Sequence, residues 1–424
     1  MKFLKIFLVS LFIFENSFGI RLIRDAEIET VLTDMVKPIF KVAGLKEKSA
    51  KIFVVNSDEI NAFTIGNGYI FINSGLLLKF KDPAQVIAVL SHETAHIAAG
   101  HINRLMAGVL NRQRSATGVM LAGLLATILT GSDKAIAASL GYLMAEERLF
   151  LRYSRGEEFA ADNLGASYME KLGYSSDYMI SVFQTFQNDS ILNGGEFTPE
   201  YVKSHPDANS RIAALKSRNK RLSPKKDKNL VEKYSRILRK LRAYLKGRNS
   251  SKDEYSRAIY LHRCGKTIEA MAILEKLIEK NPHDIFYKEP LAQLLYESGK
   301  LEKSIEIYQQ IYEKDLNPLI KKDYAEVLIE ANRNLEKAIQ ILESIKYDSY
   351  FDSDIFRLLA KAYGKKNEIG ISNFMLAQEK LINGELLIAK QLLDICLSQL
   401  DRKKENSYIK KAKYLKELIN RNQR

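Results

Sequence analysis

Ser-His-Glu-Thr-Ala-His-Ile-Ala-Ala-Gly-His, residues 91–101, is the stretch of sequence that decides the fold. Inside it, His92 and His96 are about one helical turn apart, so on a helix both imidazoles share a face and can reach one metal ion. Glu93 projects beside that ion, where a carboxylate can take a proton from water. The spacing predicts a catalytic metal-binding helix; a helix with two incidental, solvated histidines is the alternative.

A zinc site also needs a third protein ligand and an open position for water. Glu158 and Asp162 follow about sixty residues later and are one helical turn apart, so both can face the site. We expect Glu158 to ligate zinc and Asp162 to fix the tautomer of a ligand histidine. Glu157 is the rival ligand, although only Glu158 has an acid four residues further on. Together these motifs predict a zincin-type metallopeptidase with one Zn²⁺ per chain.

The length and charge of the chain limit the classes that it can belong to. With 424 residues and 46% apolar residues, it is neither disordered nor polytopic, and it has room for two or three domains. Most of the net charge of +14 arises in residues 216–250, which contain fourteen Lys and Arg and two acids. A solvated linker helix near an anionic membrane surface fits this stretch. A nucleic-acid footprint is the alternative, but no recognition module or interleaved aromatics accompany it, so no nucleic-acid partner is expected.

The N-terminus has the features of a secretory signal peptide. Two lysines precede the apolar run Ile6 to Phe14, which is too short to span a bilayer. Ser17 and Gly19 supply small residues at the cleavage site, so residues 1–19 are the predicted signal peptide. An uncleaved anchor is the alternative. Export without other targeting signals predicts a periplasmic location.

Residues 20–215 are predicted to form an α+β peptidase domain, mostly helical with a small antiparallel sheet. Apolar residues recur at helical spacing from Arg21 to Gly44. Three β-branched runs follow, and Gly66-Asn67-Gly68 between the last two is typical of a hairpin turn. An exposed edge of this sheet would hold an extended substrate by backbone hydrogen bonds. A purely structural hairpin is the alternative.

The metal helix is expected to begin near Asp82-Pro83, because Pro is tolerated in the first helical turn. Two apolar segments follow it, at residues 118–130 and 135–145, and neither reaches transmembrane length. We interpret them as buried core helices. A hairpin or lid that touches a membrane is the alternative, which leaves peripheral membrane contact open.

Residues 251–424 are predicted to form an all-α solenoid of tetratricopeptide (TPR) repeats. Pairs of residues five apart, mostly small, recur there at 34-residue intervals, the TPR period, and once more after 51 residues, consistent with one intervening extra helix. A generic helical bundle is the alternative. Because the concave face of a solenoid normally binds a protein, we assign the array to partner recruitment. The recurring pairs are Gly265 and Ala270, Gly299 and Ser304, Arg333 and Ala338, and Gly384 and Ala389.

Several motifs of this sequence occur together in one known family. They are His92-Glu93-x-x-His96, Glu158-x-x-x-Asp162, Ser204-His205-Pro206 with Arg211, the strand Asn61-Ala62-Phe63, and the helix start Asn73-Ser74-Gly75-Leu76-Leu77. Over about residues 21–245 the chain resembles the CAAX-prenyl-protease-like gluzincins. Exported members with a C-terminal TPR array are the BepA-like outer-membrane assembly metalloproteases, and this chain resembles their whole plan. It departs from them at Ile65-Gly66-Asn67-Gly68, where relatives usually have a Pro-Gly-Gly-like turn.

His205 is one of six histidines in the chain and precedes a proline, which favours an extended backbone. From such a loop its imidazole can swing to the zinc, as the resemblance also implies. We favour a latch that takes the fourth metal position and displaces the catalytic water. The competing role is a hydrogen bond to the oxyanion, shared with Arg211, and a surface histidine without a role is the third alternative.

Two functions remain open for the chain as a whole. The first is a periplasmic endopeptidase for misfolded or stalled exported proteins, with the TPR array contacting the outer-membrane assembly machinery. The second is a largely latent protease that acts as a chaperone or adaptor in outer-membrane protein assembly. The intact motif residues favour the enzyme.

Overall fold

The computed structural model describes most of the chain after its first twenty residues. The predicted signal peptide, the apolar segments at 118–130 and 135–145, and Asn67 of the hairpin turn lie outside the described residues. The structure describes residues 21–66, 68–102, 153–192, 201, 205, 208–218, 227–246, 253–314, 317–346, 353–383, 385–400 and 406–422.

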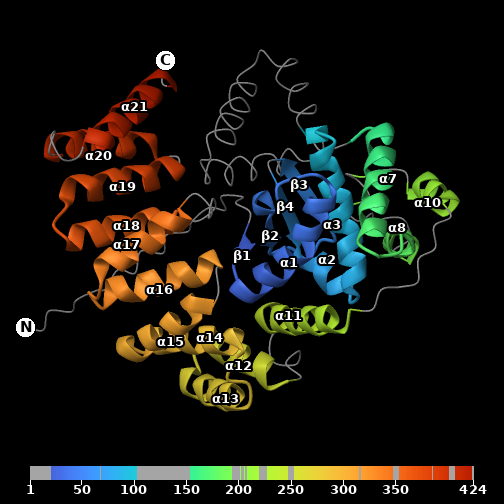
Figure 1. Cartoon of the computed structure of the whole chain (residues 1–424), viewed down its shortest axis with the longest axis horizontal. Helices are drawn as coiled ribbons and strands as arrows, with labels where there is room; N and C mark the ends of the chain where they lie inside the picture. The colour runs from blue at the N-terminus through green and yellow to red at the C-terminus, as the bar shows by residue number, and fades with distance from the viewer. Residues whose placement is uncertain are drawn as a thin grey trace, which may run out of the picture.

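The described strands form one mixed sheet in the order β1-β2-β4-β3 (Figure 1). β4 pairs with β3 in an antiparallel hairpin, as expected, but it pairs with β2 in parallel. The prediction of an antiparallel sheet is therefore wrong for this central pair. Apolar patterning identifies a strand but does not choose its neighbour. The strands are β1 (Leu22–Ile23), β2 (Lys51–Val55), β3 (Ala62–Gly66) and β4 (Tyr69–Asn73).

The two faces of the sheet carry different side chains because successive residues of a strand alternate. Aliphatic residues such as Ile70 and Ile72 join the core that the sheet shares with α1 (Ala26–Val42) and α3 (Pro83–Ala98). On the opposite face, Phe71 stacks between Phe63 and Phe53 at 5.1 and 5.5 Å. Cross-strand aromatic pairs of this kind stabilise a sheet and fix its register.

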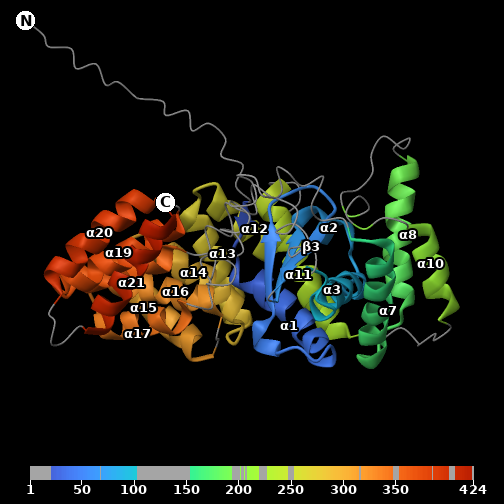
Figure 2. The same cartoon turned by 90° about the horizontal axis from the view of Figure 1, so that it is seen from above.

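The helix that carries the His-Glu motif begins where the sequence predicts. The Asp82 side chain accepts a hydrogen bond from the Ala84 amide at 2.9 Å, and Pro83 is the first residue of α3. α3 packs against α7 (Arg155–Lys171) and α8 (Asp177–Leu192), and α10 (Ala208–Ser217) lies beside both of these. Figure 2 shows α7, α8 and α10 on the side of the sheet away from the C-terminal helices. The short α2 (Ser74–Lys79) follows β4.

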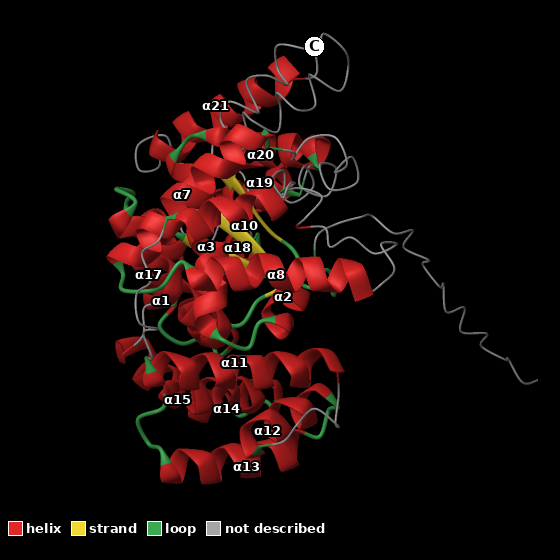
Figure 3. Cartoon of the chain, turned by 90° about the vertical axis from the view of Figure 1, so that its right-hand side faces the viewer, coloured by secondary structure: helices red, strands yellow, loops and turns green. Residues whose placement is uncertain are grey.

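The basic stretch after the peptidase region contains α11 (Lys228–Lys246), an amphipathic helix. It is less solvated than predicted, because Tyr234, Ile237 and Leu241 are buried in the core of the peptidase part. The Tyr234 hydroxyl lies 2.8 Å from the Phe80 carbonyl and 3.2 Å from the Leu77 carbonyl. α11 separates the peptidase part from α12 (Glu254–Arg263) and α13 (Thr267–Lys280) (Figure 3). The opposite face of α11 packs against α12, the first helix of the C-terminal region.

The C-terminal region consists of successive antiparallel helix pairs. The first helix of each of the first four pairs is followed closely by a residue of positive φ: Gly265, Gly299, Asn332 and Asn367. The fourth pair was not identified from the sequence, whereas the third was, although Asn takes the place of Gly in both. The helices are α12 (Glu254–Arg263), α13 (Thr267–Lys280), α14 (Ile285–Glu297), α15 (Leu301–Lys314), α16 (Pro318–Glu330), α17 (Leu335–Ile345), α18 (Asp354–Lys365), α19 (Ile369–Ile382), α20 (Leu386–Gln399) and α21 (Asn406–Asn422).

A buried cluster of charges joins α1 to α11 and to the C-terminal helices. Nζ of Lys240 lies 2.8 Å from Asp25 Oδ2 and 3.3 Å from Glu27 Oε2. Arg236 pairs with both Glu27 and Asp284. Separating these elements would leave buried charges without counterions, which is costly. The helical array is thus fixed against the peptidase part by more than apolar packing. None of the described helices is both long and apolar enough to cross a membrane.

Candidate metal centre

The site is built where α3 and α7 approach each other closely. A Cβ atom at Gly165 of α7 would lie 3.2 Å from the His92 backbone nitrogen, so only glycine allows this separation without a shift. From α3, His92, Glu93 and His96 point into the space between the helices, and all three are at most 1% exposed. From α7, Glu158 points toward them and is fully buried.

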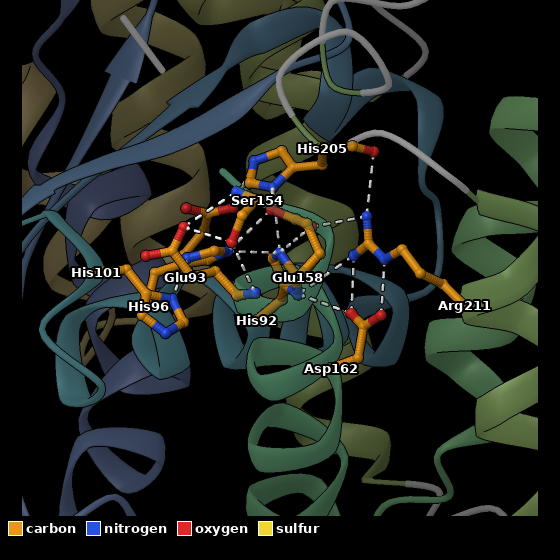
Figure 4. Close-up of polar contacts among 10 residues, drawn as sticks. His92, Glu93, His96, His101, Ser154, Glu158, Asp162, His205 and Arg211 are labelled. Carbon is orange, nitrogen blue, oxygen red and sulfur yellow. Dashed lines mark hydrogen bonds and ion pairs between the residues drawn. The ribbon is translucent and has the colours of Figure 1, made fainter. Parts of the chain in front are cut away.

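Four ligand-type groups converge at this point: His92, His96, Glu158 and His205 (Figure 4). One donor atom from each lies within 4.8 Å of the other three. The two Nε2 atoms of His92 and His96 are 3.0 Å apart, and His205 Nδ1 lies 2.8 Å from Glu158 Oε1. The structure therefore brings together the two predicted histidine ligands, the predicted carboxylate ligand and the histidine predicted to gate them.

Behind His92, Asp162 and Arg211 form a second layer. Asp162 Oδ1 lies 2.9 Å from His92 Nδ1, the nitrogen that points away from the other ligands. The Arg211 guanidinium donates from Nε and NH2 to the two Asp162 oxygens, each at 2.7 Å, and NH1 lies 2.8 Å from Glu158 Oε2. NH1 also donates to the His205 carbonyl at 3.1 Å. Every guanidinium nitrogen of Arg211 thus has an acceptor within the protein.

Glu157 takes a different position from its neighbour. Its carboxylate accepts the Ser154 amide at 3.0 Å, and its own amide donates to the Ser154 hydroxyl at 3.2 Å. This reciprocal arrangement is a capping box, which satisfies free amides at the start of α7. The structure does not place Glu157 among the converging ligands, whereas it places Glu158 there.

Burial and neighbouring charges set the protonation of the site. Burial raises the pKa of Glu93 to about 8 and lowers the pKa of His96 to about 2. For His92, burial alone would lower the pKa, but the bonds to Asp162 and Glu158 outweigh it and raise the pKa to about 9. Burial opposes ionisation of Glu158 as well, yet the adjacent His205 and the other histidines keep its pKa below the usual range. These couplings are expected where several ionisable groups share one desolvated pocket.

These groups fit a divalent metal ion. Imidazole nitrogens with one carboxylate are a donor set that zinc accepts. Within the described residues, neither carboxylate oxygen of the buried Glu93 has a hydrogen-bond donor. A buried carboxylate without a donor is costly unless a ligand or reactant supplies its partner. Both the donor set and the position of Glu93 therefore match a hydrolytic metal centre.

Three further residues contact the ligands and were not identified as part of the site from the sequence. Tyr153 stacks on His96 with ring centroids 3.8 Å apart, and Tyr201 stacks on His205 at 4.4 Å. His101 Nδ1 lies 2.8 Å from His96 Nδ1. The tyrosines lie outside any periodic motif, so no local pattern points to them. His101 is the last residue of the stretch 91–101. A third histidine so close to the His-Glu motif is the one sequence signal that could have identified it as part of the site.

A helix that presents His-Glu-x-x-His to a carboxylate from a second helix is characteristic of a class of zinc metallopeptidases. Residues 23–219 match the model of Peptidase family M48, so this part of the chain is similar to that metallopeptidase family. The chain carries a metallopeptidase domain followed by helix pairs.

The chain is also similar to individual proteins of known name. It is 24% identical over 254 residues to the Beta-barrel assembly-enhancing protease of Escherichia coli (strain K12), covering 55% of this chain and 51% of that protein. It is 23% identical over 261 residues to the protein of the same name from Yersinia pestis. The human mitochondrial Metalloendopeptidase OMA1 is 27% identical over 189 residues, which are 44% of this chain and 36% of that protein. The chain spans about half the length of the beta-barrel assembly-enhancing relatives that it matches.

Proposed function

We propose that this chain is a periplasmic, zinc-dependent endopeptidase that acts in the quality control of exported or outer-membrane proteins. The observation that carries the proposal is the convergence of His92, His96 and Glu158 beside Glu93, whose carboxylate accepts no hydrogen bond from the described residues and lies 3.6 Å from His205 Nε2. The match of residues 23–219 to the model of Peptidase family M48 supports it. So does the similarity to relatives whose name includes beta-barrel assembly.

In this proposal His92, His96 and Glu158 hold the zinc ion. When bound, zinc supplies Lewis-acid polarisation of the scissile carbonyl and acidifies water. Glu93 takes the proton of the attacking water on a carboxylate oxygen and delivers it to the leaving amine. Burial favours this role, because it raises the pKa of Glu93 above the usual carboxyl range and so makes the carboxylate a stronger base.

Asp162 and Arg211 act by positioning the ligands. Asp162 accepts the Nδ1 proton of His92, which leaves Nε2 free to bind metal. Because the nitrogens of Arg211 already have acceptors in Asp162, Glu158 and His205, we assign Arg211 to holding this layer together rather than to the oxyanion. The fork of a guanidinium suits this task, since it binds a carboxylate in a fixed plane.

His205 is proposed to be a latch. A catalytic zinc site has three protein ligands and an open position, whereas a site with four protein ligands is closed. His205 lies among the ligands with Nδ1 3.3 Å from His92 Nε2, and its ring is 2% exposed. In this position it would exclude the attacking water and the substrate carbonyl. Withdrawal of residue 205 would then activate the enzyme.

Two other parts of the proposal concern partners. The strand β3 lies at one end of the described sheet and packs against α3, so its edge is suited to hold an extended substrate near the metal. The helix pairs have the period of TPR repeats, and we assign them to recruitment of the outer-membrane assembly machinery. The proposal also includes peripheral contact of the peptidase part with a membrane surface.

The latch position also favours a second candidate function. With His205 among the ligands, the chain would be largely latent and would serve as a chaperone or adaptor through its helical array. Metal analysis together with digestion of unfolded casein separates the two. The peptidase proposal requires about one zinc per chain and cleavage that a chelator abolishes and zinc restores. Stoichiometric zinc without cleavage, even when His205 is substituted, would favour the adaptor.

A further inference from the structure

His96 has two nitrogens with different surroundings. Its Nε2 faces the ligand cluster, 3.0 Å from His92 Nε2 and 3.5 Å from Glu158 Oε1. Its Nδ1 faces away from the cluster and lies 2.8 Å from Nδ1 of His101. Figure 4 shows His101 on the far side of His96 from Glu158 and Arg211. His101 is 2% exposed, so this contact is made inside the protein.

The positions of the protons follow from this geometry. If Nε2 of His96 offers its lone pair to a metal, Nδ1 must carry the proton, because a neutral imidazole has one N–H. That Nδ1–H then donates to His101, and His101 Nδ1 must accept with its lone pair. The proton of His101 consequently resides on Nε2. A contact of 2.8 Å between two ring nitrogens is consistent with one donor and one acceptor.

The two ligand histidines are thus supported by different chemistry. Asp162, itself held by Arg211, accepts from His92, whereas a neutral imidazole accepts from His96. We propose that His101 is a positioning residue that selects the metal-binding tautomer of His96. This inference rests on the proposed function, since it assumes that His92, His96 and Glu158 bind zinc.

Packing alone does not supply this selection. The Tyr153 ring stacks on His96 at an interplanar angle of 25°, which fixes the plane of the imidazole. Stacking has the same energy whichever nitrogen carries the proton, to a first approximation. Only a hydrogen-bond partner at Nδ1 distinguishes the tautomers, and second-layer partners of metal-bound histidines typically have this role.

A matched pair of substitutions tests the proposal. In His101→Asn, the amide oxygen occupies about the place of Nδ1 and can accept the same hydrogen bond. His101→Leu has nearly the same size and shape as the Asn variant but offers no acceptor. Zinc affinity, measured by competition with a chromophoric chelator, should fall roughly 10- to 100-fold in the Leu variant. In the Asn variant it should stay within about threefold of wild type if the hydrogen bond is what matters.

Two further measurements make the result independent of activity. Cobalt(II) substituted for zinc should show a changed visible spectrum in His101→Leu and a nearly wild-type one in His101→Asn. In the zinc-loaded wild-type protein, nitrogen-15 NMR should find the proton of His96 on Nδ1. The NMR result remains decisive if the Leu variant does not fold, because a proton on Nε2 would overturn the proposal.

The outcomes separate this inference from the proposed function. Equal zinc affinity in the Leu and Asn variants, whether unchanged or equally weakened, would overturn the role of His101 and leave the peptidase proposal standing. His92→Ala serves as the reference and should lose zinc in the same assay. If the wild-type chain itself bound no zinc, the proposed function would fail, and the role of His101 with it.

Discussion

Arg211 closes on Asp162 through two parallel hydrogen bonds, from Nε to Oδ2 and from NH2 to Oδ1, each 2.7 Å long. Both side chains are at most 3% exposed. Asp162 in turn contacts Nδ1 of His92, so a residue of α10 is linked to a ligand on α3 through one carboxylate of α7. The site therefore requires α3, α7 and α10 to pack against one another.

Arg211→Met should destabilise the fold by about 3–5 kcal/mol, because it leaves two buried carboxylates without their cation. Urea unfolding of the metal-free protein measures this change. Arg218→Met is the matched control: Arg218, directly after α10, pairs with Glu170 of α7 but is 25% exposed, so its loss should cost about 1 kcal/mol or less. Equal effects at the two positions would contradict the importance assigned to the buried pair.

Glu93→Gln should keep zinc and lose hydrolysis. The amide preserves shape but cannot take a proton from water, so the rate should fall at least about a hundredfold. Peptide cleavage and zinc content are measured on the same sample, and the zinc content should equal that of the wild type. Near-normal turnover with full zinc would remove Glu93 from the mechanism.

Glu158→Ala should release zinc, because the carboxylate ligand is removed from the proposed set of two histidines and one carboxylate. Glu157→Ala is the neighbouring control and should retain zinc. Its cost should be confined to the capping box with Ser154, on the order of 1 kcal/mol of stability. Zinc lost from the Glu157 variant and kept in the Glu158 variant would reverse the assignment.

His205→Ala distinguishes the three roles considered for this histidine. A latch predicts raised basal proteolysis, since the position beside His92 and Glu158 is vacated. An oxyanion donor predicts a rate lower by roughly a hundredfold or more. An unchanged rate would mean that His205 has no role in turnover. His283→Ala, at an exposed position in the helical array, controls for general effects of losing a histidine.

Glu289→Gln should change the pH dependence of stability. Burial and the nearby Asp25, Asp323 and Glu27 raise the pKa of Glu289 to about 8, although Lys240 opposes this. Between its unfolded pKa near 4.5 and about 8, the folded state binds the extra proton, so rising pH removes stability, by at most about 5 kcal/mol. The Gln side chain does not ionise, so the variant lacks this loss of stability with rising pH.

Unfolding in urea at pH 6 and at pH 9 measures this effect. The stability of Glu289→Gln relative to the wild type should increase between the two pH values. Glu306→Gln, at an exposed position on α15, should show no such increase. The same pH dependence of stability in the wild type and in Glu289→Gln would contradict the raised pKa of Glu289 in the folded protein.

The start of the metal helix and the relation of its two histidines could be predicted because both are local. Asp82 and Pro83 begin α3 through contacts within one turn, and residues four apart share a face on any α-helix. The helix pairs were predictable for the same reason, since each repeats one local arrangement of turn and small residue. The fourth pair, at Asn367, was not identified, although the third, at Asn332, was recognised with the same replacement of glycine by asparagine.

Other features depend on contacts between segments that are far apart in the sequence. The parallel pairing of β2 with β4, the clamp of Arg211 on Asp162 and the burial of Lys240 beside Asp25 arise only when separate elements close on one another. A sequence pattern states which face of an element is apolar, but it does not state which partner will cover that face. The sequence by itself therefore determined the metal-binding helix and the α+β and all-α character of the two parts. The tertiary structure decided which polar groups meet behind the ligands. A buried charge is costly unless it is paired, and its partner comes from whichever segment the fold places beside it.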